Sequence, residues 1–214
     1  MQEGTNLRTD FQIHSVETVQ SVNTFWFGLE QDDALTAQQQ STLWWSKNED
    51  VDRQIRSRFA STVRGAAQHQ LDDWAAIPSG LLALILLTDQ FSRNMYRGTP
   101  ASFESDAIAR DWCLQGLAQG ADRKLRMIER VFFYLPLEHS ESPDHQKQSV
   151  QLFTQLLQDV PSAHHDMFNG FLTFALRHQQ FIERFGRFPH RNAILGRDST
   201  PEEIIFLQQP GSSF

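Results

Sequence analysis

The sequence predicts an all-α protein built as a single-domain array of antiparallel helices. Apolar residues recur at helical spacing in most long segments, and no run of alternating residues favours a strand. Prolines and glycines occur at intervals that suit helix starts and ends. Short connections between so many helices favour antiparallel neighbours, as in a bundle or a helical solenoid.

The chain of 214 residues suits one compact domain, 1–214, because it is long enough to bury a sizeable core. No internal stretch is rich enough in Pro, Gly or Ser to act as a linker. About residues 1–12 and 209–214 are expected to be loose tails.

Three helices are predicted in the first third of the chain. Residues 16–27 place Val and Trp side chains on one face and end at Gly28, and a short helix should cover residues 35–45. Asn48 is a suitable cap for the third helix, whose apolar residues recur every fourth position: Val51, Ile55, Phe59 and Val63.

The middle of the chain predicts two further helices. Pro78 fits the first turn of a helix that runs through residue 97 and stops at Gly98. Thr99 and Pro100 then offer a cap and a first-turn proline for a helix reaching toward Gly116 or Gly120.

Four more helices are predicted in the last part of the chain. Residues 124–134 should be helical until Pro136 interrupts them, and another helix should follow Ser142 and Pro143. Residues 168–185 form one long helical pattern. The sequence Thr-Pro-Glu-Glu at 200–203 is a capping-box pattern that opens a last short helix to Leu207.

Composition excludes several classes of protein. The formal net charge of −7 argues against binding to nucleic acid, which needs a broad basic face. The longest apolar run, 81–87, is too short to span a membrane, and no secretory signal is apparent, so a cytoplasmic location is expected. The single cysteine, Cys113, excludes an internal disulfide and is expected to be a buried thiol.

The segment 185–197, FGRFPHRNAILGR, concentrates basic and amide side chains against the overall charge. It holds no acidic residue, and its glycines and proline predict a shaped loop. Arginine presents planar donors suited to carboxylates and phosphates, and the chain has sixteen arginines but only three lysines. These donors are expected to hold an anionic ligand or the protein's own carboxylates.

Three other polar groups are candidates for chemistry. Asp89, Arg93 and Arg97 form one charged stripe on a helix, which indicates an ion-pair network or the wall of a cleft. His139 lies between the carboxylates of Glu138 and Glu141 and could act as a general base. His178 lies on an apolar helix face, a position typical of core and functional histidines alike. No histidines show the spacing of a zinc site, and no cofactor fingerprint occurs, so neither a metal nor a cofactor is expected.

Several motifs resemble the domain of unknown function 924 family. They are 86–110, LLTDQFSRNMYRGTPASFESDAIAR; 130–141, RVFFYLPLEHSE; the segment 185–197 followed by STPEE; and the N-terminal FWFG and WW. The resemblance covers about residues 19–207 and implies an all-α fold similar to tetratricopeptide-like superhelices, without implying a function. The residues that match its motifs are Asp89, Gln90, Phe91, Arg93, Asn94, Arg97, Gly98, Asp106, Pro136, Glu138, His139, Ser140, Glu141, His178, 185–192, Gly196 and Arg197. The main departure is Ser92, where the family more often has proline.

The polar motifs match the family better than the apolar helix faces do, although a helical scaffold alone requires only pattern and volume. We therefore expect these motifs to converge on one cleft that binds a small carboxylate or phosphate. Its acid/base candidates are Glu138, His139 and His178, and hydrolysis or proton transfer would be its chemistry. The expected ligand contacts are Arg93, Arg97, Arg184, Arg187, Arg191 and Asn192.

Two other interpretations stay open. In one, the chain is a tetratricopeptide-like scaffold that binds a peptide or protein partner in an apolar groove. In the other, every polar motif is an internal brace, and the arginines are neutralised by Asp89, Asp106, Glu138 and Glu141.

Overall fold

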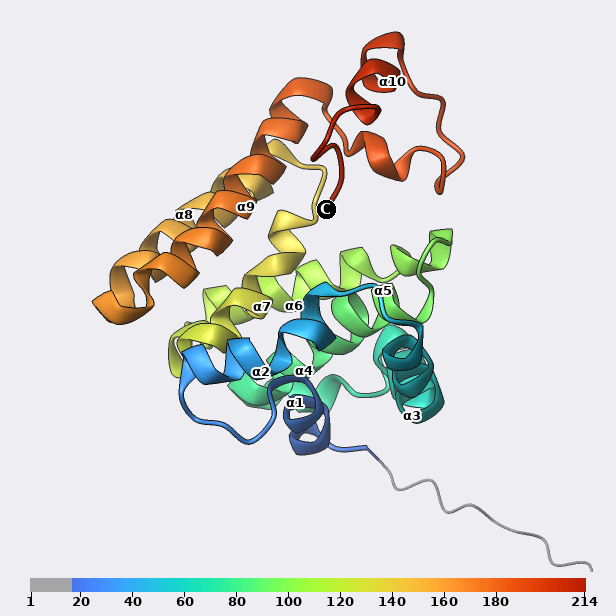
Figure 1. Cartoon of the computed structure of the whole chain (residues 1–214). Coiled ribbons are helices and arrows are strands. Elements are labelled where there is room, and N and C mark those ends of the chain that lie inside the picture. Colours follow the sequence, from blue (N-terminus) through green and yellow to red (C-terminus); the bar gives the residue numbers. More distant parts are fainter. Residues whose placement is uncertain (1–16) are drawn as a thin grey trace, which may run out of the picture.

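The computed structural model describes residues 17–214, and within that range all regular secondary structure is helical, with no strand (Figure 1). The predicted all-α class is confirmed. The tetratricopeptide-like superhelix stays a prediction, and the tail predicted at 1–12 lies outside the described residues. The helices are α1 (Val19–Phe27), α2 (Asp33–Trp45), α3 (Glu49–Ala67), α4 (Pro78–Ile85), α5 (Ser92–Met95), α6 (Asp106–Ala118), α7 (Met127–Glu138), α8 (Pro143–Asp159), α9 (His165–Phe185) and α10 (Pro201–Leu207).

Helix starts follow the capping residues that the sequence predicted. The Asn48 side chain accepts hydrogen bonds from the first backbone N–H groups of α3. At α10, Thr200 Oγ1 accepts from the backbone N–H of Glu203 at 3.2 Å, and Glu203 Oε2 accepts from the Thr200 N–H at 2.7 Å. Both helices therefore begin where side chains satisfy otherwise unpaired backbone donors.

The helix predicted from Pro78 to residue 97 is interrupted by a π-helical turn, Leu86–Phe91, between α4 and α5. Every side chain of this turn is buried. The hydroxyl groups of Thr88 and Ser92 donate to the carbonyls of Leu84 and Leu87, at 2.7 and 3.1 Å. These bonds satisfy carbonyl oxygens where the regular hydrogen-bond pattern is altered.

Two predicted helix boundaries at prolines are wrong. Pro136 does not end α7, which continues to Glu138, because a proline so near the end of a helix removes only one hydrogen bond. Pro100 opens a short 3₁₀ turn, Pro100–Ser102, and α6 begins only at Asp106. Thr99 makes no side-chain cap, so nothing holds an α-helical start there.

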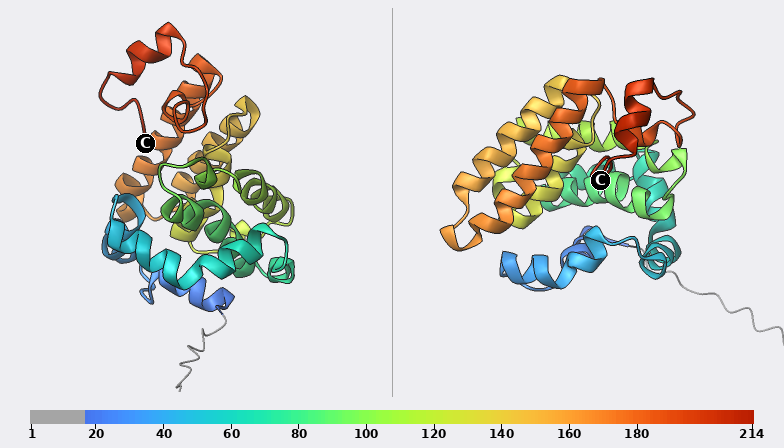
Figure 2. Two further views of the ribbon diagram at one scale, coloured as in Figure 1. Left: turned by 90° about the vertical axis from the view of Figure 1, so that its right-hand side faces the viewer. Right: turned by 45° about the horizontal axis from the view of Figure 1, so that its top comes forward.

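The main core surrounds α4, which contacts α1, α6 and α7. Aromatic rings fill it: the Trp26 ring lies 5.4 Å from that of Phe91 and 5.5 Å from that of Phe132, centroid to centroid. Helices α8 and α9 pack side by side as an antiparallel pair, and α10 lies at the far side of the molecule from α1 and α2 (Figures 1 and 2). A second apolar cluster joins α9 to the segment 185–197 and to α10, and it consists of Phe181, Ile182, Phe188 and Phe206.

Residues 209–214, predicted as a loose tail, lie against α9 in the structure. Arg177 Nη2 donates to the Gly211 carbonyl at 3.0 Å, Ser212 is buried, and the Phe214 ring contacts α9. Within the described range, no helix combines the length and apolar character that crossing a membrane requires.

Candidate functional site

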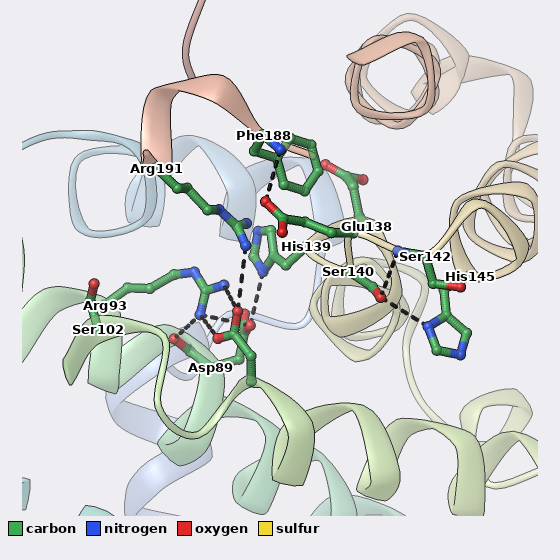
Figure 3. Close-up of polar contacts among 12 residues, drawn as sticks. Asp89, Arg93, Ser102, Glu138, His139, Ser140, Ser142, His145, Phe188 and Arg191 are labelled. Carbon is green, nitrogen blue, oxygen red and sulfur yellow. Dashed lines mark hydrogen bonds and ion pairs between the residues drawn. The ribbon is translucent and has the colours of Figure 1, made fainter. Parts of the chain in front are cut away.

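Three motifs that are distant in the sequence meet in one buried polar cluster (Figure 3). Asp89 lies in the π-helical turn, His139 is the residue that caps the end of α7, and Arg191 lies in the 3₁₀ turn Pro189–Arg191. The one proline and two glycines of 185–197 break the helix there, so this segment can fold back over the ends of α5 and α7. We call the set Asp89, Arg93, Asp106, Glu138, His139, His178 and Arg191 the polar cluster.

Asp89 is the fully buried centre of the polar cluster. Its carboxylate lies 2.9 Å from Arg93 Nη1 and 2.8 Å from His139 Nδ1, and it accepts from Gln90 Nε2 at 2.6 Å. Burial alone would raise the pKa of Asp89, but the Arg93 charge and the His139 and Gln90 hydrogen bonds hold it below its ordinary value. Asp89 is therefore a permanent anion that orients its neighbours.

His139 is positioned as a neutral base. Because Asp89 is ionised, His139 Nδ1 must carry the proton of their hydrogen bond, which leaves Nε2 as the basic nitrogen. Burial and the nearby Arg93 and Arg191 charges lower the pKa of His139, against the opposing effect of Asp89. An imidazole oriented by a buried aspartate is the arrangement used by general bases in hydrolases.

Glu138 and His178 lie in contact, and neither is charged in the folded protein near neutral pH. Glu138 Oε1 lies 3.1 Å from His178 Nδ1, and both side chains are buried. Burial and the Asp89 charge raise the pKa of Glu138 to about 8, so the acid is largely protonated at neutral pH. His178 Nδ1 also donates to the Phe174 carbonyl at 2.9 Å, and burial holds the His178 pKa well below its ordinary value.

Arg191 is buried and lies farther from its carboxylate partner than Arg130, the other buried arginine of the described residues, which is 3.1 Å from Asp159. Its guanidinium carbon lies 4.8 Å from the centroid of the Phe103 ring and 4.4 Å from that of Phe188. Its nearest carboxylate is Asp106, at 3.6 Å, and Asp106 already accepts two hydrogen bonds from Arg93. Arg191 Nε has no partner in the described chain, and burial together with the Arg93 charge lowers the Arg191 pKa to about 10.

The other predicted ligand contacts bond to the protein's own groups. Arg97 pairs with Asp52 on α3, at 2.8 Å. Asn192 donates to Ser199 Oγ and Glu203 Oε2, at 3.0 and 3.2 Å. The two remaining arginines also pair with α10, Arg184 with Glu202 and Arg187 with Glu203. The structure thus brings Arg93 and Arg191 to the predicted acid/base residues. The other four predicted contacts instead brace α3, α10 and the segment 185–197.

The set of catalytic and ligand-binding residues predicted from the sequence did not include Asp89, Asp106 or Phe214. The signal for Asp89 was present, because a carboxylate directly after an apolar run falls inside the core unless the helix ends. Ser140 was named only among the residues that match the family motifs, and its Oγ lies 2.9 Å from His145 Nδ1. Ser140 Oγ accepts from the Ser142 N–H as well, at 3.3 Å, so it serves the start of α8.

The polar cluster is largely buried, and Arg93, Asp106 and His139 keep 15–19% of their side-chain surface exposed. Its side chains are buried or nearly so, and two surface hollows of about 440 and 520 Å³ lie elsewhere, along α3 and the end of α5. Across residues 17–214, no three His, Cys, Asp or Glu side chains are placed to hold a metal ion together.

Comparisons with other proteins place the chain in a family. Residues 22–211 match the family model described as bacterial protein of unknown function (DUF924), and the chain belongs to this family. A solved structure of a protein of unknown function from Agrobacterium tumefaciens is similar to it, with 33% identity and a TM-score of 0.75. The match covers 89% of this chain and 96% of that one. The search of curated proteins found no match.

Proposed function

We propose that the polar cluster binds a small molecule with one anionic group, a carboxylate or a phosphate, and transfers a proton to or from it. The observation that carries this proposal is the incomplete pairing of Arg191. Its side chain is 8% exposed, its nearest carboxylate is 3.6 Å away and shared with Arg93, and its Nε has no partner in the described residues.

A buried guanidinium without a close anion is costly, because burial removes water that nothing else replaces. The lowered pKa of Arg191 is consistent with this cost. An anionic group beside Arg191 would supply the missing acceptor, and the planar guanidinium suits an oxygen-bearing anion.

The neighbouring groups have protonation states suited to acid/base chemistry. His139 is neutral and oriented by Asp89, so its Nε2 can accept a proton. Glu138, with a pKa raised to about 8, can donate one. Environments that push titratable groups in opposite directions are typical of sites for proton transfer or hydrolysis.

The proposal assigns only Arg191 to the ligand and leaves Arg93 as the partner of Asp89 and Asp106. One ligand contact is thus proposed, where the sequence predicted six. The carboxylate pairing of Arg97, Arg184 and Arg187 supports a bracing role for those side chains.

The test is a titration with acetate and with inorganic phosphate, followed by NMR of the histidine ring signals. In the wild type, saturable shifts should occur at His139. Arg191→Gln should abolish them, and Arg191→Lys, which keeps the charge but loses the planar fork, should weaken them. Arg184→Gln is the matched control, because Arg184 is a half-exposed arginine of the same region that pairs with Glu202.

Thermal unfolding of each variant separates loss of binding from loss of fold. Equal binding of acetate by Arg191→Gln and by the wild type would rule the proposal out. So would histidine signals that neither anion moves in the folded wild type.

A further inference from the structure

The Phe214 ring covers His178 at the edge of the polar cluster. The two rings are nearly parallel, with an interplanar angle of 16° and centroids 3.5 Å apart. Phe214 is 39% exposed, whereas His178 is only 5% exposed beneath it. One face of the phenyl ring is therefore held by the protein while the rest of the side chain meets solvent.

The surroundings of Phe214 form a binding site for an aromatic ring. The centroid of the Phe214 ring lies 4.8 Å from that of Phe181, 5.8 Å from that of His190 and 6.3 Å from that of Phe188. The guanidinium carbon of Arg177 lies 5.1 Å from the same ring centroid. A neutral imidazole face, aromatic edges and a cation together favour an aromatic ring over an aliphatic chain.

This ring site adjoins the groups that the proposed function uses. The His178 ring lies 6.2 Å from the His139 ring, and the Arg191 guanidinium carbon lies 4.4 Å from the centroid of Phe188. A ring that replaced Phe214 would thus stack directly on His178, a member of the polar cluster.

The segment that carries Phe214 is held by few polar contacts. Arg177 donates to the Gly211 carbonyl at 3.0 Å, and Ser212 Oγ donates to the Leu207 carbonyl at 3.2 Å. Neither contact involves Phe214 itself, so the ring can leave while the turn at 209–212 stays in place.

We propose that the His178 face is a subsite for the aromatic ring of a small aromatic carboxylate or phosphate, and that Phe214 occupies it until the ligand displaces the ring. This inference rests on the proposed function for the anionic group, which binds Arg191. A tethered ring competes at a high effective concentration, so its removal should tighten binding by about tenfold.

The test compares the wild type with Phe214→Ala and Phe214→Leu in titrations with phenylacetate, acetate and benzyl alcohol. The stacked phenyl ring shields the His178 ring protons, so both variants should move these signals downfield. Phenylacetate should bind both variants more tightly than the wild type and return the signals upfield, while acetate should bind all three proteins alike. Ile205→Ala, which removes an exposed apolar side chain from α10, is the matched control and should behave as the wild type does.

The leucine variant keeps an apolar cover over His178, so it remains informative if the alanine variant is unstable. Equal affinity of phenylacetate for the wild type and for both folded variants would overturn the subsite. If acetate binds through Arg191 but phenylacetate binds no better, the subsite fails and the anion site stands. If benzyl alcohol shields His178 in the variants while no anion binds, the ring subsite stands and the proposed function fails.

Discussion

His139 Nδ1 lies 2.8 Å from Asp89 Oδ1, and this contact joins the end of α7 to the π-helical turn. The two residues are fifty positions apart, and both come from segments that also carry apolar core residues. The contact therefore links the main core directly to the groups proposed to perform chemistry. A change at Asp89 should affect both stability and the protonation of His139.

Asp89→Asn should destabilise the protein by about 3–5 kcal/mol, because it removes the fully buried charge that pairs with the partly buried Arg93. Urea denaturation measures this change in the free energy of unfolding. Asp50→Asn, at an exposed pair with Arg53, is the control and should cost far less. A loss at Asp89 no greater than that at Asp50 would contradict the buried network.

The stability of the protein should fall as the pH rises from about 6.5 to 8. Glu138 has its pKa raised from an ordinary value of 4.5 to about 8, so in this range the folded state binds more protons than the unfolded state. The contribution of Glu138 to the free energy of unfolding is fully present below about pH 4.5, and it is lost as the pH rises through about 8. Burial lowers the pKa values of His178 and His190, so the unfolded state binds more protons at these residues below about pH 6.5. They therefore make stability rise with pH only in that lower range.

Denaturation curves at a series of pH values test this sign. Glu138→Gln should flatten the decline between about pH 6.5 and 8, because the amide does not titrate. A wild-type stability that rises across this interval would show that Glu138 is ionised in the folded protein.

Binding of an anion beside Arg191 should be accompanied by proton uptake. His139 and His190 lie near Arg191 with lowered pKa values, about 4 for His190, and a nearby negative charge favours their protonated forms. Calorimetry of acetate binding near pH 6 in buffers of different ionisation enthalpy measures the number of protons taken up. Affinity should weaken as the pH rises, and pH-independent binding with no proton exchange would place the anion elsewhere.

Two helical glycines should respond to alanine in opposite ways. At Gly116 on α6, an added Cβ would lie 2.4 Å from Cζ of the buried Phe133, so Gly116→Ala should cost about 1–3 kcal/mol. At the exposed Gly170 on α9, an added Cβ meets nothing within 4 Å. Gly170→Ala should therefore stabilise by about 0.5–1 kcal/mol through helix propensity alone. Thermal or urea unfolding of the pair checks both signs, and a stabilised Gly116→Ala would contradict the packing of α6 against α7.

Local signals predicted most of the helices because caps and apolar spacing act within a few residues. Asn48 and Thr200 illustrate this, since each bonds to backbone groups two or three positions away. The interruption at 86–91 could not be predicted in the same way, because it depends on a core that surrounds the turn on all sides. Pro136 was misleading for a related reason: its cost depends on how far α7 continues beyond it.

The polar cluster was only partly predictable. The sequence identified Glu138, His139, His178 and Arg191 by residue type and context, but which carboxylate meets which arginine depends on tertiary structure. Arg97 and Arg187 have the same donors as Arg191, and only the positions of Asp52 and Glu203 distinguish their pairing. Phe214 carried no sequence signal, because the preceding QQPGSS segment has no apolar periodicity that would place the ring on a helix face.

The π-helical turn inserts one additional residue between α4 and α5, which otherwise form one continuous helix. Upstream, 81–85 present apolar side chains all round, and downstream, Arg93 and Asn94 must face acidic partners on α6 and α3. One residue corresponds to about 100° of helix rotation, so deleting a single residue within 86–91 would turn these downstream side chains away from their partners. The pairing of Arg93 and Asn94 with α6 and α3 thus depends on one additional residue in this turn, and removing that residue would break the pairing without changing any side chain that takes part in it.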